Sequence, residues 1–407
     1  MSILYISYDG ALGPLGESQV VAYLERLSAR HAIALLSFEK PLDAADTARV
    51  DALRKRLALA GIRWLPLRYH RRQPVLSTAW DVAHGIVAAV REARRRPIRV
   101  VHARGYVAAL IALAVRRFVA ARFLFDMRGF WPDEKVDAGH WRPGSPLYRV
   151  AKRWERRFFE SADATVSLTV AGVEAVRKLG YAIRADAALE IIPTCTDLRR
   201  FSPGPRDATL AARLGLGGGS VIGCVGTISN WYLRLPMLDY LARLTVILRK
   251  LTVLIVTQED HAALRRGAIA AGVPGDRLRI TRATFAEMPD HLRLMDVGMF
   301  FIKPVFSKKG SVATKLGEFL ATGVPVIIND GVGDSGQIVR EGRAGVVLPD
   351  VTRESFAASL PAVSALLNDP GVRHRCRATA ERWFDLDAGV ERYARLYARL
   401  GAAPQEP

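Results

Sequence analysis

The sequence predicts an α/β protein with two doubly wound, Rossmann-like domains. Short apolar runs alternate with longer amphipathic stretches along almost the whole chain, a pattern that favours parallel sheets with right-handed crossovers. The alternation stops at residues 197–220, "DLRRFSPGPRDATLAARLGLGGGS", which are rich in proline and glycine and hold no long apolar run. A chain of 407 residues, 50% of them hydrophobic, is long enough to bury two such cores.

The first domain is expected at residues 1–195. Each of its predicted strands is a short apolar run that ends in polar or turn-forming residues. The amphipathic stretches between these runs, beginning with residues 17–29, predict the helices that cover the sheet. The predicted strands are "ILYIS", "AIALLSF", "IRWLPL", "VVHAR", "RFLFDM", "ATVSL" and "LEIIP".

An interdomain linker is expected at residues 196–219 and a second domain at residues 220–380. The last segment, residues 381–407, carries apolar residues at helical spacing and predicts a terminal helix. The predicted strands of the second domain are "VIGCVG", "LTVLIV", "RLRIT", "VGMFF", "VPVII" and "AGVVLP".

The net charge of +19 is concentrated in the first half of the chain. Residues 1–200 hold 33 Lys and Arg against 20 Asp and Glu, a balance of +13, whereas the remaining residues carry +6. The excess peaks in "RYHRR", "REARRRPIR" and "AKRWERRFF". A basic face near tryptophans suits an anionic membrane surface or a polyanion, and arginines spread over solvated faces are the alternative.

Cysteine usage and hydropathy indicate the compartment. Cys195, Cys224 and Cys376 lie far apart without metal-ligand spacing, as expected for buried free thiols in a reducing cytoplasm. No run approaches the roughly 20 uninterrupted apolar residues that a membrane span needs. The first residues, "MSILYISYDG", read as a buried strand and lack the basic start and apolar core of a signal peptide. We therefore expect a cytoplasmic protein.

Open α/β sheets bind ligands outside the carboxyl ends of their strands, so the loops that follow strands hold the candidate residues. After the first strand, Gly10, Gly13 and Gly16 are expected to let the backbone approach a phosphate or an acceptor, and a plain turn is the alternative. Their spacing is not that of a dinucleotide-binding fingerprint, and Glu39 is only a loose candidate for a ribose ligand.

Two more loops of the first domain supply candidate catalytic residues. His102 ends the fourth strand, where a histidine can titrate or donate near neutral pH, and a histidine packed beneath the next helix is the alternative. After the fifth strand, "FDMRGFWPDEKVD" places Asp126, Arg128 and Glu134 beside two aromatic residues. This composition is typical of a surface that stacks on a sugar and binds its hydroxyls, and a salt-bridged loop is the alternative.

In the second domain, the segment "KKGSVATKLGEFL" is the main candidate for a binding site, and Gly226 and Thr227 after the first strand suit contacts to phosphate or hydroxyl groups. A helix start offers backbone N–H groups to a diphosphate, and a glutamate one turn further in can accept bonds from a ribose diol. Ser311 is expected to cap the helix. The alternative is a lysine–glutamate pair on the helix surface that binds no ligand. The predicted binding residues of this segment are Lys308, Lys309, Ser311, Thr314, Lys315 and Glu318.

Three segments resemble GT-B glycosyltransferases, and within them the large retaining family 4 of bacterial polysaccharide and lipid-linked glycan biosynthesis. "IIPTCTDLRRFSP" is similar to the family's "IPNGVDLxRFxP" at the domain junction, and "KLGEFLATGVPVI" is similar to its donor-site "EAMAxGxPVI". "DMRGFWPDE" resembles the stretch that ends strand five of the first domain. The resemblance spans nearly the whole chain, and it implies a GT-B fold with a central cleft and a terminal helix that crosses back onto the first domain.

The same resemblance implies a reaction and its participants. A hexosyl or N-acetylhexosaminyl group would move from a nucleotide-sugar, most commonly a UDP-sugar, to a hydroxyl, with retention at the anomeric carbon and with no bound cofactor or metal. The first domain would bind the acceptor and the second the donor. Glu318 matches the family's ribose-binding second glutamate, whereas the position of the first glutamate holds Gly310 in this chain.

The resemblance also implies a cellular setting. The expected acceptor is a glycan or a lipid-linked glycan of exopolysaccharide or lipopolysaccharide biosynthesis. The expected location is peripheral, on the inner face of the cytoplasmic membrane, where the basic first domain would meet anionic lipid.

Three other functions remain open at this point. A nucleotide-sugar 2-epimerase shares the two-domain architecture, and a non-catalytic sugar-nucleotide-binding protein would use the same residues without turnover. A nucleic-acid-binding protein would explain the charge. However, the sequence has no zinc-finger spacing and no RNA-binding sheet motif, and its basic residues are spread over several helices, so nucleic acid is not the expected partner.

Overall fold

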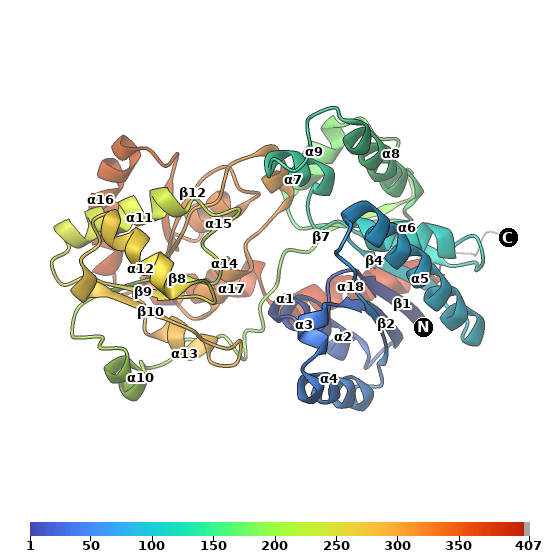
Figure 1. The fold of residues 1–407 in the computed structure, drawn as a ribbon, viewed down its shortest axis with the longest axis horizontal. Coiled ribbons are helices and arrows are strands. Elements are labelled where there is room, and N and C mark those ends of the chain that lie inside the picture. The colour runs from blue at the N-terminus through green and yellow to red at the C-terminus, as the bar shows by residue number, and fades with distance from the viewer. Residues whose placement is uncertain (403–407) are drawn as a thin grey trace. The chain divides into compact units, whose positions relative to one another are not determined.

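The computed structural model describes residues 1–402 (Figure 1). The chain divides into two compact units, which are described separately below. Unit 1 consists of Met1–Pro193 together with the segment that begins at Leu386, and unit 2 consists of Thr194–Asp385. The last part of the predicted terminal segment, residues 403–407, lies outside the described residues.

Unit 1 is built on a seven-stranded sheet in the order β3-β2-β1-β4-β5-β6-β7, in which every pairing is parallel. This confirms the first of the two predicted sheets. The chain runs from β1 toward β3 on one side and from β4 toward β7 on the other, so the carboxyl ends of β1 and β4 form the topological switch point. The strands are β1 (Ser2–Ser7), β2 (Ala32–Glu39), β3 (Arg63–Arg68), β4 (Val100–Arg104), β5 (Arg122–Asp126), β6 (Ala164–Ser167) and β7 (Ala188–Ile191).

Helices cover both faces of this sheet. Right-handed crossovers place the helices between β1 and β3 on one face and those between β3 and β7 on the other. On the second face, the alanine-rich and largely buried α6 packs against both α5 and α8. The terminal α18 packs beside α2, so the last helix returns to the first unit, as predicted (Figure 1). The helices are α1 (Pro14–Gly16), a π-helix (Glu17–Val21), α2 (Ala22–Leu27), α3 (Pro41–Ala44), α4 (Thr47–Leu59), α5 (Pro74–Arg95), α6 (Tyr106–Val115), α7 (Trp131–Asp137), α8 (Pro146–Ser161), α9 (Val170–Lys178) and α18 (Leu386–Ala402).

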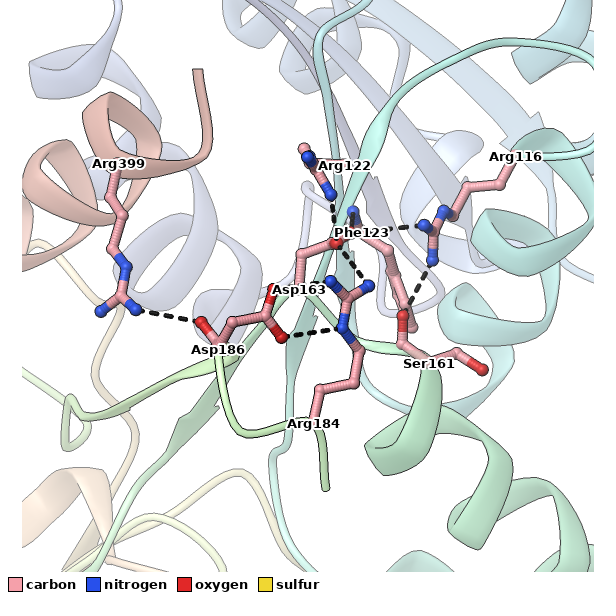
Figure 2. Close-up of polar contacts among 8 residues, drawn as sticks. All are labelled: Arg116, Arg122, Phe123, Ser161, Asp163, Arg184, Asp186 and Arg399. Atoms are coloured by element: carbon pink, nitrogen blue, oxygen red, sulfur yellow. Dashed lines mark hydrogen bonds and ion pairs between the residues drawn. The ribbon is translucent and has the colours of Figure 1, made fainter. Parts of the chain in front are cut away.

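A buried carboxylate joins several elements of unit 1 just before β6 (Figure 2). One oxygen of Asp163 accepts a hydrogen bond from the backbone N–H of Phe123 at 2.7 Å. The other accepts from Arg122 at 3.0 Å and from Arg184 at 3.2 Å. Arg116 also lies 3.5 Å from the carboxylate. A single negative charge therefore holds three arginines from separate segments of the chain.

Replacing Asp163 with asparagine is expected to lower the free energy of unfolding by about 2 kcal/mol, because three clustered guanidinium groups lose their shared carboxylate. Urea denaturation measures the change. Asp186→Asn is the matched control, since that exposed carboxylate pairs with Arg184 at the surface. The control is expected to leave the free energy of unfolding nearly unchanged, because an exposed ion pair contributes little to stability. Equal losses in the two variants would contradict the structural role of Asp163.

Unit 2 is built on a six-stranded parallel sheet in the order β10-β9-β8-β11-β12-β13, which confirms the second predicted sheet. The strands are β8 (Val221–Val225), β9 (Thr252–Val256), β10 (Leu278–Thr281), β11 (Val297–Phe300), β12 (Val326–Asn329) and β13 (Gly345–Leu348). The helices are α10 (Ala208–Arg213), α11 (Arg234–Ile247), α12 (His261–Ala270), α13 (Met288–Arg293), α14 (Thr314–Ala321), α15 (Ser335–Glu341), α16 (Arg353–Leu367) and α17 (Val372–Trp383), with 3₁₀ turns at Gly275–Arg277 and Phe306–Gly310.

The segment expected as a linker, residues 196–219, belongs to unit 2 in the structure. Arg377 donates to the backbone carbonyls of Leu198 and Phe201, and Arg279 donates to the carbonyl of Leu214. Side chains from later in unit 2 therefore fix this proline- and glycine-rich stretch.

Candidate functional site

The switch point of the second sheet lies between β8 and β11. From β8 the chain moves to β9 and β10 on one side, and β11 leads to β12 and β13 on the other. The loops after β8 and β11 consequently leave in opposite directions, which is the topology at which open α/β sheets bind ligands. The predicted segment "KKGSVATKLGEFL" follows β11 at this edge, and Gly226 and Thr227 follow β8.

Lys315, in the first turn of α14, connects these two loops. Its Nζ donates to the carbonyl of Val225 at 2.5 Å and to that of Thr227 at 3.1 Å, and it lies 3.8 Å from the centre of the Tyr232 ring. Gly226 adopts a positive φ of 72°, a conformation that favours glycine. The buried lysine thus fixes a cation at the switch point with two of its three donors used by the protein.

The loop after β8 is also held from the other side. One carboxylate oxygen of Glu259 accepts from the backbone N–H groups of Ile228 and Ser229, at 3.0 and 3.2 Å, and from the Ser229 hydroxyl at 2.7 Å. Glu259 belongs to the loop after β9. Two strand-end loops therefore support each other, and the loop next to Lys315 has a fixed conformation before any ligand arrives.

Glu318 lies one turn further along α14 and is half-buried. Burial disfavours its charged form and raises its pKa to about 7, although Lys315 and Arg200 act in the opposite direction. Within the described residues, no side chain forms a hydrogen bond or ion pair with the Glu318 carboxylate. A partly desolvated carboxylate in this state has acceptor capacity for a ligand.

The other predicted residues of this segment have varied environments. Lys308 is buried, with its Nζ 3.7 Å from the centre of the Trp231 ring, whereas Lys309 is exposed. Thr314 is half-buried and begins α14. The prediction that Ser311 caps this helix is wrong. Ala313 occupies the N-cap position without a side-chain cap, and Ser311 instead follows the preceding 3₁₀ turn in an extended conformation, two residues too early to reach the first N–H groups of the helix.

In unit 1, the structure brings His102, Asp126 and Arg128 together beneath α18. His102 and Asp126 are each 1% exposed. Nδ1 of His102 lies 2.7 Å from the Tyr397 hydroxyl, and the Tyr393 hydroxyl donates to Asp126 at 3.1 Å. Arg128 donates to the other oxygen of Asp126 at 3.3 Å. Both buried groups anchor the terminal helix, whereas the alternative that the sequence left open for His102 was packing beneath the next helix, which is α6.

The electrostatics of this cluster follow from burial and from its charges. Burial alone would raise the pKa of Asp126, but Arg128 and His102 outweigh it and hold the pKa at about 2. Burial lowers the pKa of His102 despite the nearby Asp126. The cluster therefore holds an ionised carboxylate that is matched by Arg128. Glu134 does not belong to it and lies half-buried in the first turn of α7.

The glycine loop after β1 is filled by the protein's own carboxylate. The backbone N–H groups of Ala11 and Leu12 donate to the two oxygens of Glu39, at 2.9 and 3.2 Å. A Cβ on Gly10 would lie 2.7 Å from that carboxylate, and one on Gly16 would lie 2.1 Å from the Gly10 carbonyl. Gly13, which precedes α1, has open space at its Cβ position. Close packing therefore accounts for two of the three glycines that were predicted to face a phosphate.

Sequence reasoning did not find a histidine–aspartate pair at the same edge of unit 1. Nδ1 of His70, after β3, lies 2.6 Å from the buried carboxylate of Asp81, which also accepts from the Tyr8 hydroxyl at 2.9 Å. The side chain of His70 is 38% exposed. Its position shortly after a predicted strand is the available signal, and the surrounding basic stretch "RYHRR" hides it.

Comparison with known protein families identifies both units. The model described as "Glycosyl transferase 4-like domain" matches residues 16–194, and the model described as "Glycosyl transferases group 1" matches residues 219–369. The chain is a GT-B glycosyltransferase. The second match contains all six strands of unit 2 together with Lys315 and Glu318, and the first begins at Gly16 and contains β2–β7 of the unit 1 sheet.

Solved structures share the fold of this glycosyltransferase. A sucrose-phosphate synthase from Thermosynechococcus elongatus is 16% identical with a TM-score of 0.75, covering 99% of this chain and 100% of its own. Anabaena Alr3699/HepE, solved in complex with UDP and glucose, is 15% identical with a TM-score of 0.70, covering 98% and 99%. A putative UDP-N-acetylglucosamine 2-epimerase from Listeria monocytogenes is 12% identical with a TM-score of 0.60, covering 100% and 98%.

No curated protein matches the sequence of this glycosyltransferase significantly. Among the helices in residues 1–402, none combines the length and the apolar character needed to cross a membrane.

Proposed function

We propose that this glycosyltransferase is a retaining enzyme of family 4 that transfers a sugar from a UDP-sugar to a hydroxyl of a glycan or lipid-linked glycan. The observation that carries the donor assignment lies at the switch point between β8 and β11, where the start of α14, the fixed ammonium of Lys315 and the partly desolvated carboxylate of Glu318 lie within about one helical turn. Unit 2 holds the donor and unit 1 holds the acceptor.

The proposed chemistry uses these groups to stabilise a leaving group. The bond between the anomeric carbon and the diphosphate oxygen breaks, and negative charge grows on the phosphate. The third N–H of Lys315 and the free N–H groups at the start of α14 stabilise this charge, a role that does not require a bound metal. The acceptor hydroxyl forms the new bond to the anomeric carbon and gives its proton to the departing phosphate, while Glu318 holds the ribose.

The predicted donor residues divide into three roles in this proposal. Lys315 and the start of α14, with Thr314, bind the diphosphate. Gly226 and Thr227 let the loop after β8 approach it. Lys308 and Lys309 lie in the turn where the family's first glutamate would stand, beside Gly310, and supply positive charge near the sugar, while Ser311 directly after the turn supplies a hydroxyl.

The acceptor-side roles are assigned to residues at the ends of β4 and β5 and at the start of α7. Asp126 and His102 act as positioning residues that hold α18 and the strand ends in place. Arg128 and Glu134, which are only partly buried, remain the proposed contacts to the acceptor or to the reacting sugar. We further propose that the acceptor belongs to cell-surface polysaccharide biosynthesis and that the enzyme works at the inner face of the cytoplasmic membrane.

Calorimetric titration of the full chain with UDP-, GDP- and ADP-glucose tests the donor assignment. We expect binding of UDP-glucose that is at least tenfold tighter than binding of the other two, equal to about 1.4 kcal/mol. Incubation of the protein with UDP-N-acetylglucosamine alone separates transfer from epimerisation. Formation of the 2-epimer in the absence of any acceptor would overturn the transferase proposal in favour of an epimerase, and donor binding without turnover on any acceptor would indicate a sensor.

A further inference from the structure

The helical layer formed by α5, α6 and α8 presents an unusual outer surface. These helices cover the same face of the unit 1 sheet, with α6 in contact with both of the others (Figure 1). The inner face of α8 is fixed by Glu155, which is fully buried and accepts hydrogen bonds from Tyr106 at 2.7 Å and from Tyr181 at 2.6 Å. The opposite face of α8 is therefore held toward solvent.

Large apolar side chains stand on that outer surface at helical spacing. On α8, Val150 is 45% exposed and Trp154 is 44% exposed, and Leu147 lies on the same side one turn earlier. On α5, Leu76 is 67% exposed and Trp80 is 57% exposed. Positions three or four residues apart share one face of a helix, so each helix carries an apolar stripe.

The acidic residues of α5 and α8 are buried or paired with arginines. On α5, Asp81 and Glu92 are buried, and Glu92 pairs with Arg63. On α8, Glu155 is buried and Glu160 pairs with Arg156. These four carboxylates are all the acidic residues of the two helices, so none of them is left unpaired at the surface to repel an anion.

Arginines flank the apolar stripes. On α8, Arg149, Arg153 and Arg157 are exposed, and on α5 the exposed arginines lie in the last turns of the helix. Within the described part of the chain, no carboxylate forms an ion pair with Arg149 or Arg153. Leucine, valine and tryptophan beside unpaired arginines suit binding to a membrane surface. The apolar side chains can enter the boundary of the acyl chains, while the guanidinium groups stay at the lipid headgroups.

We propose that this surface, made of the exposed residues of α5 and α8, docks on an anionic lipid bilayer with the helices parallel to the membrane plane. The inference rests on the proposed function, because a lipid-linked acceptor is held in the bilayer and the enzyme must reach it there. A nucleic acid would use the arginines but gains nothing from exposed Leu147 and Val150, and a second copy of the chain would carry the same positive charge and repel it.

Co-sedimentation of the full chain with vesicles tests the proposal. We expect binding to vesicles of equal parts phosphatidylcholine and phosphatidylglycerol, little binding to pure phosphatidylcholine, and weaker binding as salt rises. The apolar variant Leu147→Ser, Val150→Ser, Trp154→Ser and the arginine variant Arg149→Gln, Arg153→Gln, Arg157→Gln are each expected to lose about tenfold or more in partitioning. The control Lys55→Gln, Leu59→Ser changes exposed residues of α4 on the other face of the sheet and is expected to partition like the wild type.

Further measurements distinguish membrane docking from misfolding, from nucleic-acid binding and from dimer formation. Circular dichroism and thermal melting confirm that each variant is folded, and UDP-glucose affinity in solution is expected to be unchanged in all three, so that failure of docking and failure of donor binding are distinguishable. Equal partitioning of the apolar, arginine and control variants would overturn the proposal. Binding of a DNA duplex that depends on the α8 arginines, or a dimer that the apolar variant dissociates, together with no vesicle binding, would also overturn it.

Discussion

Replacing Glu318 with glutamine is expected to weaken UDP-glucose binding by about tenfold to a hundredfold, because the ribose diol loses a charged acceptor worth roughly 1.5–3 kcal/mol. The same change is expected to stabilise the free protein at pH 8. Burial raises the pKa of Glu318 to about 7 in the folded state, against 4.5 as its ordinary value. The folded protein therefore holds this proton more tightly than the unfolded chain, and its stability falls as pH rises between about 4.5 and 7.

The direction of this pH dependence can be measured by comparing the free energy of unfolding of wild type and variant. Glutamine does not ionise, so the variant is expected to unfold with the same free energy as wild type near pH 4.5 and with about 2 kcal/mol more above pH 7, a value reduced for the partial exposure of the side chain. In the wild type, donor binding favours the ionised form and is expected to strengthen as pH rises through about 7, whereas the variant loses this dependence. Glu354→Gln, at an exposed position of α16, is the control. A pH-independent wild-type affinity would contradict a ribose role for Glu318.

Replacing Lys315 with methionine is expected to lower kcat/KM by about a hundredfold, because one preorganised donor to the leaving phosphate is removed at nearly constant side-chain volume. The carbonyls of Val225 and Thr227 lose their shared donor in the same change. We therefore expect an accompanying loss of about 1 kcal/mol in unfolding free energy. Arginine is not expected to restore activity, since its planar fork does not fit the position of a compact ammonium between two carbonyls.

Ligand fragments distinguish this effect from that of Glu318. Lys315→Met is expected to weaken UDP and to spare uridine, because the lost interaction is with the phosphates, whereas Glu318→Gln is expected to weaken both. Calorimetric titration with UDP and uridine measures the difference. Lys250→Met, at an exposed position far along the sequence from α14, is the control for loss of a positive charge. An equal loss of UDP and uridine affinity in Lys315→Met would show that the lysine acts only by supporting the loop after β8.

The terminal helix could be predicted from the sequence, but its side-chain contacts could not. Its apolar stripe predicted a helix, and the resemblance placed that helix on the first domain, where the structure has it. Yet nothing local to His102 or Asp126 reveals that Tyr393 and Tyr397, nearly three hundred residues later, cover them. The same holds for Glu39, which fills the glycine loop from the end of the neighbouring strand. A contact between side chains of distant segments does not change the spacing of apolar and polar residues in either segment, so the sequence pattern does not reveal it.

The sequence by itself determined the two parallel sheets and the segment that forms the start of α14, because apolar runs, helical spacing and turn residues are local consequences of backbone geometry. It could not determine which polar side chains at the strand ends are free to act. Only the tertiary structure decided that the Glu318 carboxylate has no hydrogen-bonding side chain among residues 1–402, that Lys315 is fixed between two carbonyls, and that Asp126 and His102 are enclosed by protein. The reason is physical: the ionisation and availability of a polar group depend on burial and on charges brought from distant segments, and these exist only once the chain has folded.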